Sequence, residues 1–362
     1  MEKSELGVAI VGCGRIGSLR ARLVKQHPAV KFLALADRDP ARADKLKETV
    51  GADLACGDND TAIGRSEVDA VIVSTAEAQH TQPILAALAL GKPVLVEKPI
   101  ALSLDDADAT LAAIARTGGN LRVGYSRRFK HRYLRAREQL LQGRLGTITG
   151  AVARVYNGRG QTFTILKRDP HATPIMDILT YYVDLVNWFF DGVRPVEVVA
   201  RGFRGSGVFR QAGYDIDDVS WAILTYADGA VVNLGICYTL PADYPALGQS
   251  ARVELLGTDG VMILNDDHTD QLMYSEQGFP DVMWAGHGVN MVFLGSSTPG
   301  DWALGGFWGP LATETRVWLD HILTGQPCAL ATPAEARLNL ETTIAVDRAA
   351  RTGKPVRLPL ET

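Results

Sequence analysis

The sequence LGVAIV-GCGRIG, from Leu6 to Gly17, decides the fold of the first part of this 362-residue chain. Its apolar run predicts a buried strand, and the glycines that follow at the spacing Gly-x-Gly-x-x-Gly predict a tight turn into a helix. Gly12 permits the turn, Gly14 lets the backbone approach a pyrophosphate, and Gly17 lets the helix pack closely on the sheet. Because a helix N-terminus attracts anions, the stretch predicts a dinucleotide-binding loop. The residues expected to contact the cofactor there are Gly12, Gly14, Arg15, Ile16 and Gly17.

A second apolar run ends in Asp37, twenty positions beyond Gly17. An acidic side chain at the end of a second strand is expected to accept hydrogen bonds from both hydroxyls of an adenosine ribose, and its charge repels a 2′-phosphate. The sequence therefore favours NAD over NADP as the cofactor. Arg38 keeps the NADP alternative open, because an arginine directly after the acid can stack on adenine or contact a phosphate.

The composition of the chain limits the classes of partner. A length of 362 residues exceeds what one hydrophobic core usually organises, so two domains are expected. A net charge of -4 argues against nucleic acid or an anionic membrane surface as a partner and favours small molecules. No apolar stretch suggests a signal peptide or a membrane span, so a cytoplasmic protein is expected.

The cysteines give no sign of a metal site or of a disulfide framework, because they show neither CxxC nor Cys/His ligand spacing. They stand at Cys13, Cys56, Cys237 and Cys328. Cys13 lies inside the glycine loop, where the expected role of its side chain is to be small.

Up to residue 124 the chain alternates apolar runs with amphipathic helical stretches. The predicted strands are residues 6–11, 30–36, 69–74, 93–97 and 121–125, and the predicted helices are residues 15–26, 40–49, 81–90 and 103–116. This alternation predicts a doubly wound parallel sheet, so we expect an NAD-binding Rossmann domain over residues 1–124 of an α/β protein.

The pattern changes in residues 125–362. A helix at 130–142 is followed by strands of alternating pattern at 147–156, 196–204, 219–226, 230–238 and 251–256, with hairpin turns at 227–229 and 258–260. Further helices are predicted at 174–190, 311–323 and 333–351, and the last of them can pack back on the first domain. We therefore expect a second domain of the α+β class with a mainly antiparallel sheet. The segment 278–309 has no assigned structure and is expected to contact another domain or chain, or to cover the substrate.

Candidate catalytic residues follow from the predicted sheet. Ligands of open α/β sheets bind outside the carboxyl ends of the strands, and the strand at 93–97 ends in Glu97-Lys98-Pro99. Lys98 is therefore expected to face the cofactor, with Glu97 as a structural or nicotinamide-side group. Ser74 and Thr75, at the end of the strand before, are candidate cofactor contacts or ordinary helix caps.

Together these motifs resemble the glucose-fructose oxidoreductase, inositol dehydrogenase and MocA superfamily. The resemblance covers nearly the whole chain and includes the segments 123–129 (VGYSRRF) and 352–356 (TGKPV). It implies a Rossmann domain followed by a domain with an open-faced sheet that mediates homodimers or homotetramers. It also implies hydride transfer between NAD(P) and a ring alcohol, and a Lys98–Pro99 peptide that is often cis.

In that family the lysine and a later Asp-x-x-x-His pair surround the reacting hydroxyl. Here Asp177 is followed by Tyr181 in place of the histidine, and Asp184 matches the acid three positions later. A tyrosine at this place resembles the branch that contains glucose-fructose oxidoreductase and the dimeric dihydrodiol dehydrogenases. Residues four apart on a helix share one face, about 5 to 6 Å apart at their β-carbons. We therefore expect Asp177 and Tyr181 to act on the same substrate.

Oxidation of a secondary alcohol needs a base for the hydroxyl proton and a group that stabilises the developing alkoxide. The expected roles are Tyr181 as acid/base, Lys98 as electrostatic and proton-relay partner, and Asp177 as the group that binds substrate hydroxyls and orients Lys98. His171 is the alternative base, since it stands where the family commonly has a glycine-rich turn that contacts substrate. The altered turn leaves the identity of the substrate open.

Further candidate substrate contacts lie on or just after the first strand of the second domain: Arg154, Tyr156, Asn157 and Arg159. Tyr156 and Arg159 are the two expected to bind substrate, and Arg159 suits a carboxylate. No metal is expected in the site.

The predicted function is that of an NAD-dependent dehydrogenase acting on a secondary hydroxyl of a sugar, a sugar derivative or a cyclic polyol. Two alternatives stay open. One is a dihydrodiol dehydrogenase that aromatises a cyclic diol, and the other is a non-catalytic regulator that senses NAD on the same fold. The presence of Lys98 and Asp177 argues against the regulator, because a sensor does not need a lysine at the point of hydride transfer.

Overall fold

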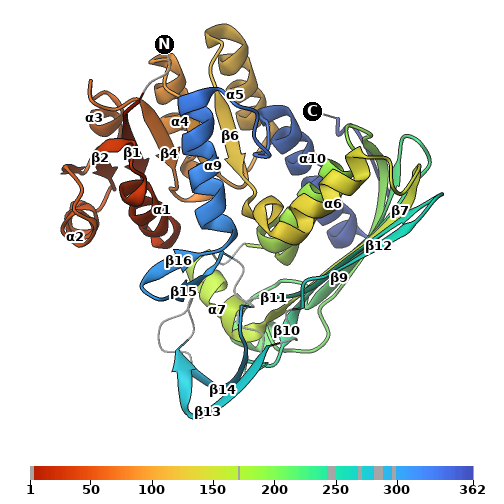
Figure 1. Cartoon of the computed structure of the whole chain (residues 1–362). Coiled ribbons are helices and arrows are strands. Elements are labelled where there is room, and N and C mark those ends of the chain that lie inside the picture. The colour runs from red at the N-terminus through yellow and green to blue at the C-terminus, as the bar shows by residue number, and fades with distance from the viewer. Residues whose placement is uncertain are drawn as a thin grey trace. The chain divides into compact units, whose positions relative to one another are not determined.

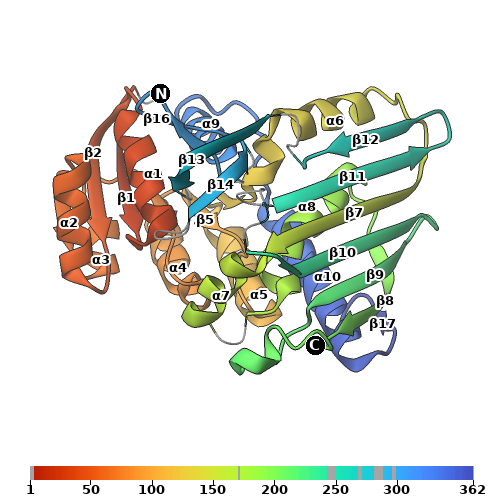
Figure 2. The ribbon, with the colours of Figure 1, turned by 90° about the horizontal axis from the view of Figure 1, so that it is seen from below.

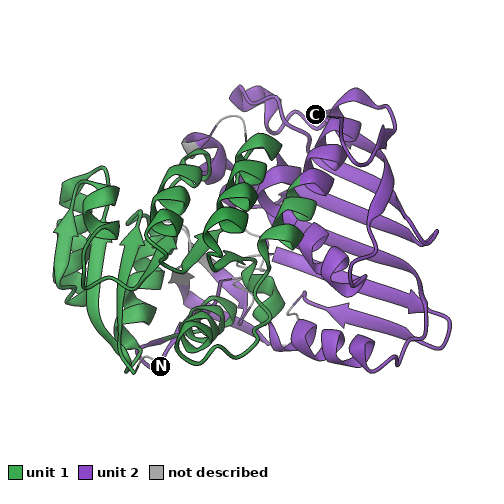
Figure 3. Cartoon of the chain, turned by 90° about the horizontal axis from the view of Figure 1, so that it is seen from above, with its two compact units in different colours: residues 1–129, 307–340 green, residues 130–306, 341–362 purple. Residues whose placement is uncertain are grey.

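The computed structural model describes residues 4–169, 172–242, 244, 249–267, 271–280, 288–295 and 299–361 (Figure 1). The chain forms two compact units, coloured separately in Figure 3. Unit 1 comprises residues 1–129 and 307–340, and unit 2 comprises residues 130–306 and 341–362. The chain thus changes unit three times, whereas the sequence predicted one division at residue 125.

Unit 1 is built on a sheet of six parallel strands in the order β3-β2-β1-β4-β5-β6. The strands are β1 (Leu6–Val11), β2 (Val30–Ala36), β3 (Leu54–Cys56), β4 (Ala70–Val73), β5 (Val94–Glu97) and β6 (Leu121–Gly124). The strand order reverses between β1 and β4, which is the point where open α/β sheets bind ligands. The predicted doubly wound parallel sheet is confirmed.

The helices of the first 129 residues connect these strands. They are α1 (Arg15–Gln26), α2 (Pro40–Val50), α3 (Asn59–Ile63), α4 (Thr81–Ala89) and α5 (Leu104–Thr117), with short 3₁₀ turns η1 (Glu77–Gln79) and η2 (Ser126–Phe129). Gly51 and Gly118 end α2 and α5 in the left-handed conformation, which favours glycine at these C-termini. Neither β3 nor α3 was predicted, because both are too short to show a clear period.

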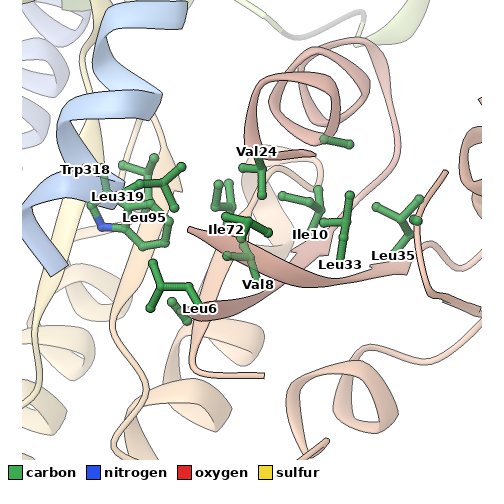
Figure 4. Close-up of a cluster of buried hydrophobic side chains, with 14 of the residues drawn as sticks. Leu6, Val8, Ile10, Val24, Leu33, Leu35, Ile72, Leu95, Trp318 and Leu319 are labelled. Atoms are coloured by element: carbon green, nitrogen blue, oxygen red, sulfur yellow. The ribbon is translucent and has the colours of Figure 1, made fainter. Parts of the chain in front are cut away.

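The core of unit 1 includes a late part of the chain. Helix α9 (Pro310–Thr324) places Trp318 and Leu319 against the sheet, beside Leu95 (Figure 4). Both side chains are fully buried in one cluster with strand residues such as Ile10. Val123 also bridges to Ala331, beyond the end of α9. Residues 307–340 are therefore part of the fold of this unit.

Unit 2 contains a seven-stranded sheet in the order β12-β11-β7-β10-β9-β8-β17 (Figure 2). The strands are β7 (Ile148–Gly158), β8 (Pro195–Phe203), β9 (Val219–Tyr226), β10 (Val231–Leu240), β11 (Gln249–Gly257), β12 (Val261–Asn265) and β17 (Val356–Arg357). All neighbours pair antiparallel except β7 and β10, which are parallel. The predicted, mainly antiparallel sheet is confirmed.

The helices of unit 2 are α6 (His131–Leu141), α7 (Arg159–Arg168), the π-helix η3 (Ile175–Leu179), α8 (Thr180–Phe189), the 3₁₀ turn η4 (Arg210–Ala212) and the second half of α10 (Pro333–Thr352). Alternate side chains of the strands are buried on the face that α8 covers. The predicted helix at 174–190 corresponds to η3 followed by α8, and α7 was not predicted. None of the helices in the described ranges is both long and apolar enough to cross a membrane.

The unassigned segment 278–309 contributes to two small sheets. One pairs β13 (Leu272–Pro280) with β14 (Gly288–Phe293), and the other pairs β15 (Asp301–Ala303) with β16 (Gly306–Trp308). Residues 281–287 and 296–298 lie outside the described residues, so the expected lid or contact role stays a prediction.

Candidate functional site

The glycine loop between β1 and α1 packs directly on the end of β4. Gly12 has a φ of 93°, and a β-carbon there would lie 2.6 Å from backbone atoms of Ser74 and Thr75. A β-carbon on Gly17 would lie 1.9 Å from the carbonyl oxygen of Gly12 and 2.7 Å from Ser74 Oγ. A β-carbon on Gly14, in contrast, would meet no atom within 4 Å. Gly12 and Gly17 are thus required for the close packing of the turn, whereas the space beside Gly14 is open to a ligand.

Asp37 stands at the end of β2 and is tied to the glycine loop. Its carboxylate accepts hydrogen bonds from the backbone N–H of Cys13 at 2.8 Å and of Asp39 at 3.0 Å. Arg42 Nη1 lies 3.3 Å from both carboxylate oxygens. The arginine that pairs with this acid is therefore Arg42, on the first turn of α2, whereas the side chain of Arg38 is exposed. Sequence reasoning missed Arg42, although it stands five positions after the acid.

Cys13 is buried within the same loop. Burial, together with the negative charge of Asp37, raises the pKa of the Cys13 thiol to about 12. The thiol is therefore protonated at neutral pH and is a poor nucleophile, in keeping with the expectation that its role is to be small.

Lys98 follows the last residue of β5. The Lys98–Pro99 peptide is cis, as the resemblance implied. The carbonyl oxygen of Pro99 lies 2.8 Å from His80 Nδ1, and His80 Nε2 lies 3.3 Å from the carbonyl oxygen of Thr75. The His80 ring thus lies between the segments that follow β4 and β5. It was not identified from the sequence, where it is a lone histidine before α4.

His80 is buried, and its burial lowers the pKa of the imidazole. A neutral imidazole carries one proton, and the shorter contact assigns that proton to Nδ1, which donates to Pro99 O. The Oγ1 of Thr75 is buried and has no hydrogen-bond partner within the protein. Because a buried hydroxyl usually has a partner, this orphan atom fits contact with a bound cofactor. The open flank of Gly14 fits a pyrophosphate in the same way.

In unit 2, Asp177 and Tyr181 lie on one helical segment. Asp177 belongs to the π-helix η3 and Tyr181 to the first turn of α8, and both are half-buried. The wide turn is closed by the N–H of Thr180, which donates to the carbonyl of Ile175. Such π-turns within helices are frequent at functional sites. Asp184, further along α8, is fully buried.

Tyr238 orients Asp177. Its hydroxyl donates to Asp177 Oδ2 at 2.9 Å from near the end of β10. Thr162 of α7 is hydrogen-bonded to the carbonyl of Tyr238 at 3.3 Å and so holds the end of that strand. The strand at 230–238 was predicted from the sequence but this contact was not, since alternation indicates the face of a side chain and not its partner.

Asn157 and Tyr156 lie on opposite faces of β7. Tyr156 is paired with Cys237 of β10 and therefore shares its face, opposite to Tyr238. The guanidinium of Arg154 lies 4.7 Å from the centre of the Tyr156 ring. The side chain of Tyr156 thus lies on the other face of the sheet from the hydroxyl that bonds Asp177, and we leave it out of the proposed site.

Asn157 is fully buried, and neither its side-chain oxygen nor its side-chain nitrogen has a hydrogen-bond partner. Arg159 begins α7, and its Nε is also buried without a partner. These groups keep hydrogen-bonding capacity that a ligand can use. His171 lies outside the described residues. Across the described ranges, no group of three or more His, Cys, Asp or Glu side chains is arranged to hold a metal ion.

Comparison with known proteins places both halves of the chain in one family. Residues 6–125 match the Gfo/Idh/MocA model described as an oxidoreductase family with an NAD-binding Rossmann fold, and residues 133–263 match the Gfo/Idh/MocA C-terminal domain. The chain is 30% identical over 261 residues to the inositol 2-dehydrogenase of Acidothermus cellulolyticus, covering 71% of this chain and 72% of that protein. It is 25% identical to the scyllo-inositol 2-dehydrogenase (NAD(+)) of Bacillus subtilis, covering 98% and 96% of the two chains.

Solved structures show the same fold. The scyllo-inositol dehydrogenase of Lactobacillus casei with bound NAD(H) and scyllo-inositol superposes with a TM-score of 0.80 at 22% identity, over 98% of this chain and 99% of that one. GenD2 from gentamicin A biosynthesis, in complex with NAD, gives a TM-score of 0.81 at 24% identity, over 99% and 98%. With the geometry of the glycine loop and of Asp37, the family models and the sequence relatives establish that the chain belongs to the Gfo/Idh/MocA family, as an NAD-dependent dehydrogenase that acts on CH–OH groups.

Proposed function

We propose that this protein oxidises a secondary ring hydroxyl of a cyclic polyol, with inositols as the first substrates to test. The observation that supports this most directly is the Tyr238–Asp177 pair with Asn157 on the neighbouring strand. A carboxylate, a phenol and an unpartnered amide are groups that bind several hydroxyls at once. Curated relatives with matching sequence are named inositol dehydrogenases, and this agrees with such a substrate.

Each residue of the proposed site has a distinct role. Bound NAD would supply the acceptor for the hydride that leaves the ring carbon. Tyr181 as phenolate would take the hydroxyl proton as general base and become a phenol, and the ammonium of Lys98 would stabilise the alkoxide that develops on the oxygen. Asp177 accepts hydrogen bonds from substrate hydroxyls, and Tyr238 holds one of its oxygens in place. Gly12 to Gly17, Asp37, Ser74, Thr75 and Glu97 are the proposed cofactor contacts.

A spectroscopic panel tests this proposal. Purified protein and NAD are mixed with myo-inositol, scyllo-inositol, monosaccharides and cyclic dihydrodiols, and the absorbance of reduced nicotinamide is followed. We expect turnover with the inositols. Turnover with a dihydrodiol and an aromatic product would instead favour the dihydrodiol dehydrogenase alternative that Tyr181 raised. Silence across the panel, with NAD binding confirmed by fluorescence, would contradict the proposal and favour a sensor.

The base is tested separately. We expect Tyr181→Phe to lower kcat on the order of 10² to 10⁴-fold, as loss of a general base does. If Tyr181→Phe is fully active and His171→Ala is inactive, His171 is the base.

We also propose that the uncovered face of the seven-stranded sheet binds a second copy of the chain. Strand pairing places one row of exposed apolar side chains on this face. They are Val199, Phe203, Trp221, Ile223, Val231, Leu256, Val261 and Ile263. The Trp221 ring lies over Gly235, where a β-carbon would come within 2.2 Å of it. An apolar patch spread over five strands is typical of an interface.

Light scattering coupled to gel filtration measures the oligomeric state. We expect a dimer or larger assembly for the native chain and a smaller mass for Ile223→Glu. Leu141→Glu is the matched control, because Leu141 is an exposed apolar residue at the end of α6, away from this face. A monomeric native chain would contradict the proposal.

A further inference from the structure

Arg20 occupies a place on α1 where an apolar residue is expected. The buried residues of this helix are Gly17, Arg20, Ala21 and Val24, at the spacing of one helical face. Arg20 has no exposed surface at all. Arginine is almost never fully buried unless its charge is paired, so its partners indicate what this buried charge does.

The guanidinium of Arg20 joins three elements of unit 1. Its Nε donates to Glu97 Oε1 at 2.8 Å, at the last residue of β5. Its Nη2 donates to Glu314 Oε2, and its Nη1 donates to Thr315 Oγ1 at 2.7 Å, both on α9. Helix α1, strand β5 and helix α9 therefore meet at one buried cation.

The position of Glu97 is fixed tightly by this arrangement. Glu97 pairs with Gly124 of β6, and a β-carbon on Gly124 would lie 3.1 Å from Arg20 Nη2 and 3.4 Å from Glu97 Oε2. The Arg20–Glu97 ion pair thus packs against the backbone of Gly124, where a larger residue would crowd it. The next residue in the chain is Lys98, followed by Pro99, whose carbonyl lies 2.8 Å from His80 Nδ1. The backbone around Lys98 is held on both sides.

We propose that Arg20 is a positioning residue for Lys98. It fixes Glu97 and thereby the backbone from which Lys98 extends at the carboxyl end of β5. This inference rests on the proposed function, in which Lys98 stabilises the alkoxide. A displacement of about 1 Å at a catalytic group can cost on the order of 10²-fold in rate. The Arg20–Glu97 ion pair, which we call the tether, therefore affects kcat although Arg20 touches neither substrate nor cofactor.

Two variants separate the tether from its charge. In the native cluster the Arg20 cation is paired with two anions, Glu97 and Glu314, so the net charge is -1. Arg20→Met/Glu314→Met leaves Glu97 alone, so the tether is lost while the net charge stays -1. Glu314→Gln keeps the Arg20–Glu97 contact and removes one negative charge. Hydrophobic residues in place of a buried ion pair are often tolerated, and Thr315 keeps its hydrogen bond to the carbonyl of Leu311 at 2.7 Å. Both variants are therefore expected to fold, and a thermal melt checks this.

Hydrogen exchange at the peptide covering residues 94–104 is the first readout, because it needs no substrate. We expect exchange there to be about tenfold faster in the double variant and unchanged in Glu314→Gln. With NAD and myo-inositol, kcat of the double variant should fall on the order of 10²-fold, while KM and the Kd for NAD stay within about threefold.

Native exchange and native kcat in a folded double variant would overturn the inference. So would an equal loss in Glu314→Gln, since that variant keeps the Arg20–Glu97 contact. Lys98→Ala is measured in parallel to tell the two proposals apart. If Lys98→Ala keeps native turnover, the proposed active site is wrong; if Lys98→Ala is inactive and the double variant is native in exchange and turnover, only the role of Arg20 is wrong.

Discussion

The two units hold the proposed ligand-binding groups in different ways. In unit 1 the glycine loop, Asp37 and Lys98 depend on backbone positions and on buried contacts that fix them, such as Asp37 with the N–H of Cys13. In unit 2, Asp177 and Tyr238 are side chains brought together from positions 61 residues apart. Unit 1 therefore positions these groups through the backbone at the ends of its strands, whereas unit 2 brings side chains together from a helical segment and a distant strand. The consequence is that changes in unit 1 should alter cofactor binding and changes in unit 2 should alter substrate binding.

Lys98 should be the exception to this division, and its variant has the largest expected effect. It belongs to unit 1, but its proposed role concerns the substrate oxygen. We expect Lys98→Ala to lower kcat by about 10³-fold, because loss of a preorganised charge at the developing oxyanion typically costs 10²- to 10³-fold. The Kd for NAD should change by less than about threefold. Steady-state kinetics with myo-inositol and fluorescence titration with NAD measure the two quantities. If the variant lost only NAD affinity, Lys98 would be a cofactor-binding residue and not the group that stabilises the alkoxide.

Asp37→Ser tests the proposed cofactor site of unit 1. The carboxylate proposed to bind ribose hydroxyls is lost, so we expect NAD to bind about 10- to 100-fold more weakly, the range for hydrogen bonds to a charged group. NADP should bind better than it does to the native enzyme, because the repulsion of the 2′-phosphate is removed. Arg42→Ala is the control and should change NAD binding far less, since a pair with an exposed arginine contributes about 0 to 1 kcal/mol. Equal losses in both variants would show that Arg42 binds the cofactor as strongly as Asp37.

Most of the proposed cofactor site in unit 1 could be predicted from the sequence, because its residues lie close together along the chain. The strand, the glycine spacing and Asp37 lie within residues 6–37 and determine one another's geometry. The position of Lys98 directly after β5 was predictable for the same reason, and its proposed role follows from that position. Strand alternation also predicted most of the second sheet, including the strand that contains Tyr238.

Partners could not be predicted where the chain brings distant segments together. The helical period of α1 indicates that Arg20 lies on the buried face of the helix. It cannot indicate the partner Glu314, which is 294 positions away on α9, a helix that belongs to the first unit. The contact of Tyr238 with Asp177 and the position of Tyr156 on the opposite face depend on strand pairing. Short elements such as β3 and α3 have too few residues to show a period.

Tyr238→Phe tests the substrate half with a smaller change. It removes the hydroxyl that donates to Asp177 while the ring stays in place. We expect kcat/KM for myo-inositol to fall about tenfold, as for a lost hydrogen bond to a charged group, with no change in NAD affinity. Tyr226→Phe is a matched control, because Tyr226 is a buried tyrosine of the same sheet that donates to Asn187 Oδ1 at 2.7 Å instead. Equal effects of the two variants would mean that the loss reflects stability and not the orientation of Asp177.

The smallest expected effect concerns His80 and the rigidity of unit 1. Burial lowers the pKa of His80 in the folded protein, against the weaker opposite effects of its contacts and of Glu77 and Glu97. Above the ordinary value of 6.5 the imidazole is neutral in both states and pH has no effect through this group. As the pH falls below 6.5, the unfolded chain binds a proton that the folded chain does not, so stability decreases by at most about 1.4 kcal/mol per pH unit.

His80→Asn keeps a donor for Pro99 O but does not titrate. Thermal melts of the native chain and of this variant at pH 7.5, 6.5 and 5.5 isolate the contribution of His80 from those of all other groups. The native chain should lose more of its Tm between pH 6.5 and 5.5, by roughly 2 °C or more per kcal/mol. Parallel curves would mean that folding does not shift the pKa of His80 and would contradict this prediction. A native chain that gains stability relative to the variant as the pH falls would instead mean that a charged ring donates to both Pro99 O and Thr75 O and holds the backbone beside Lys98.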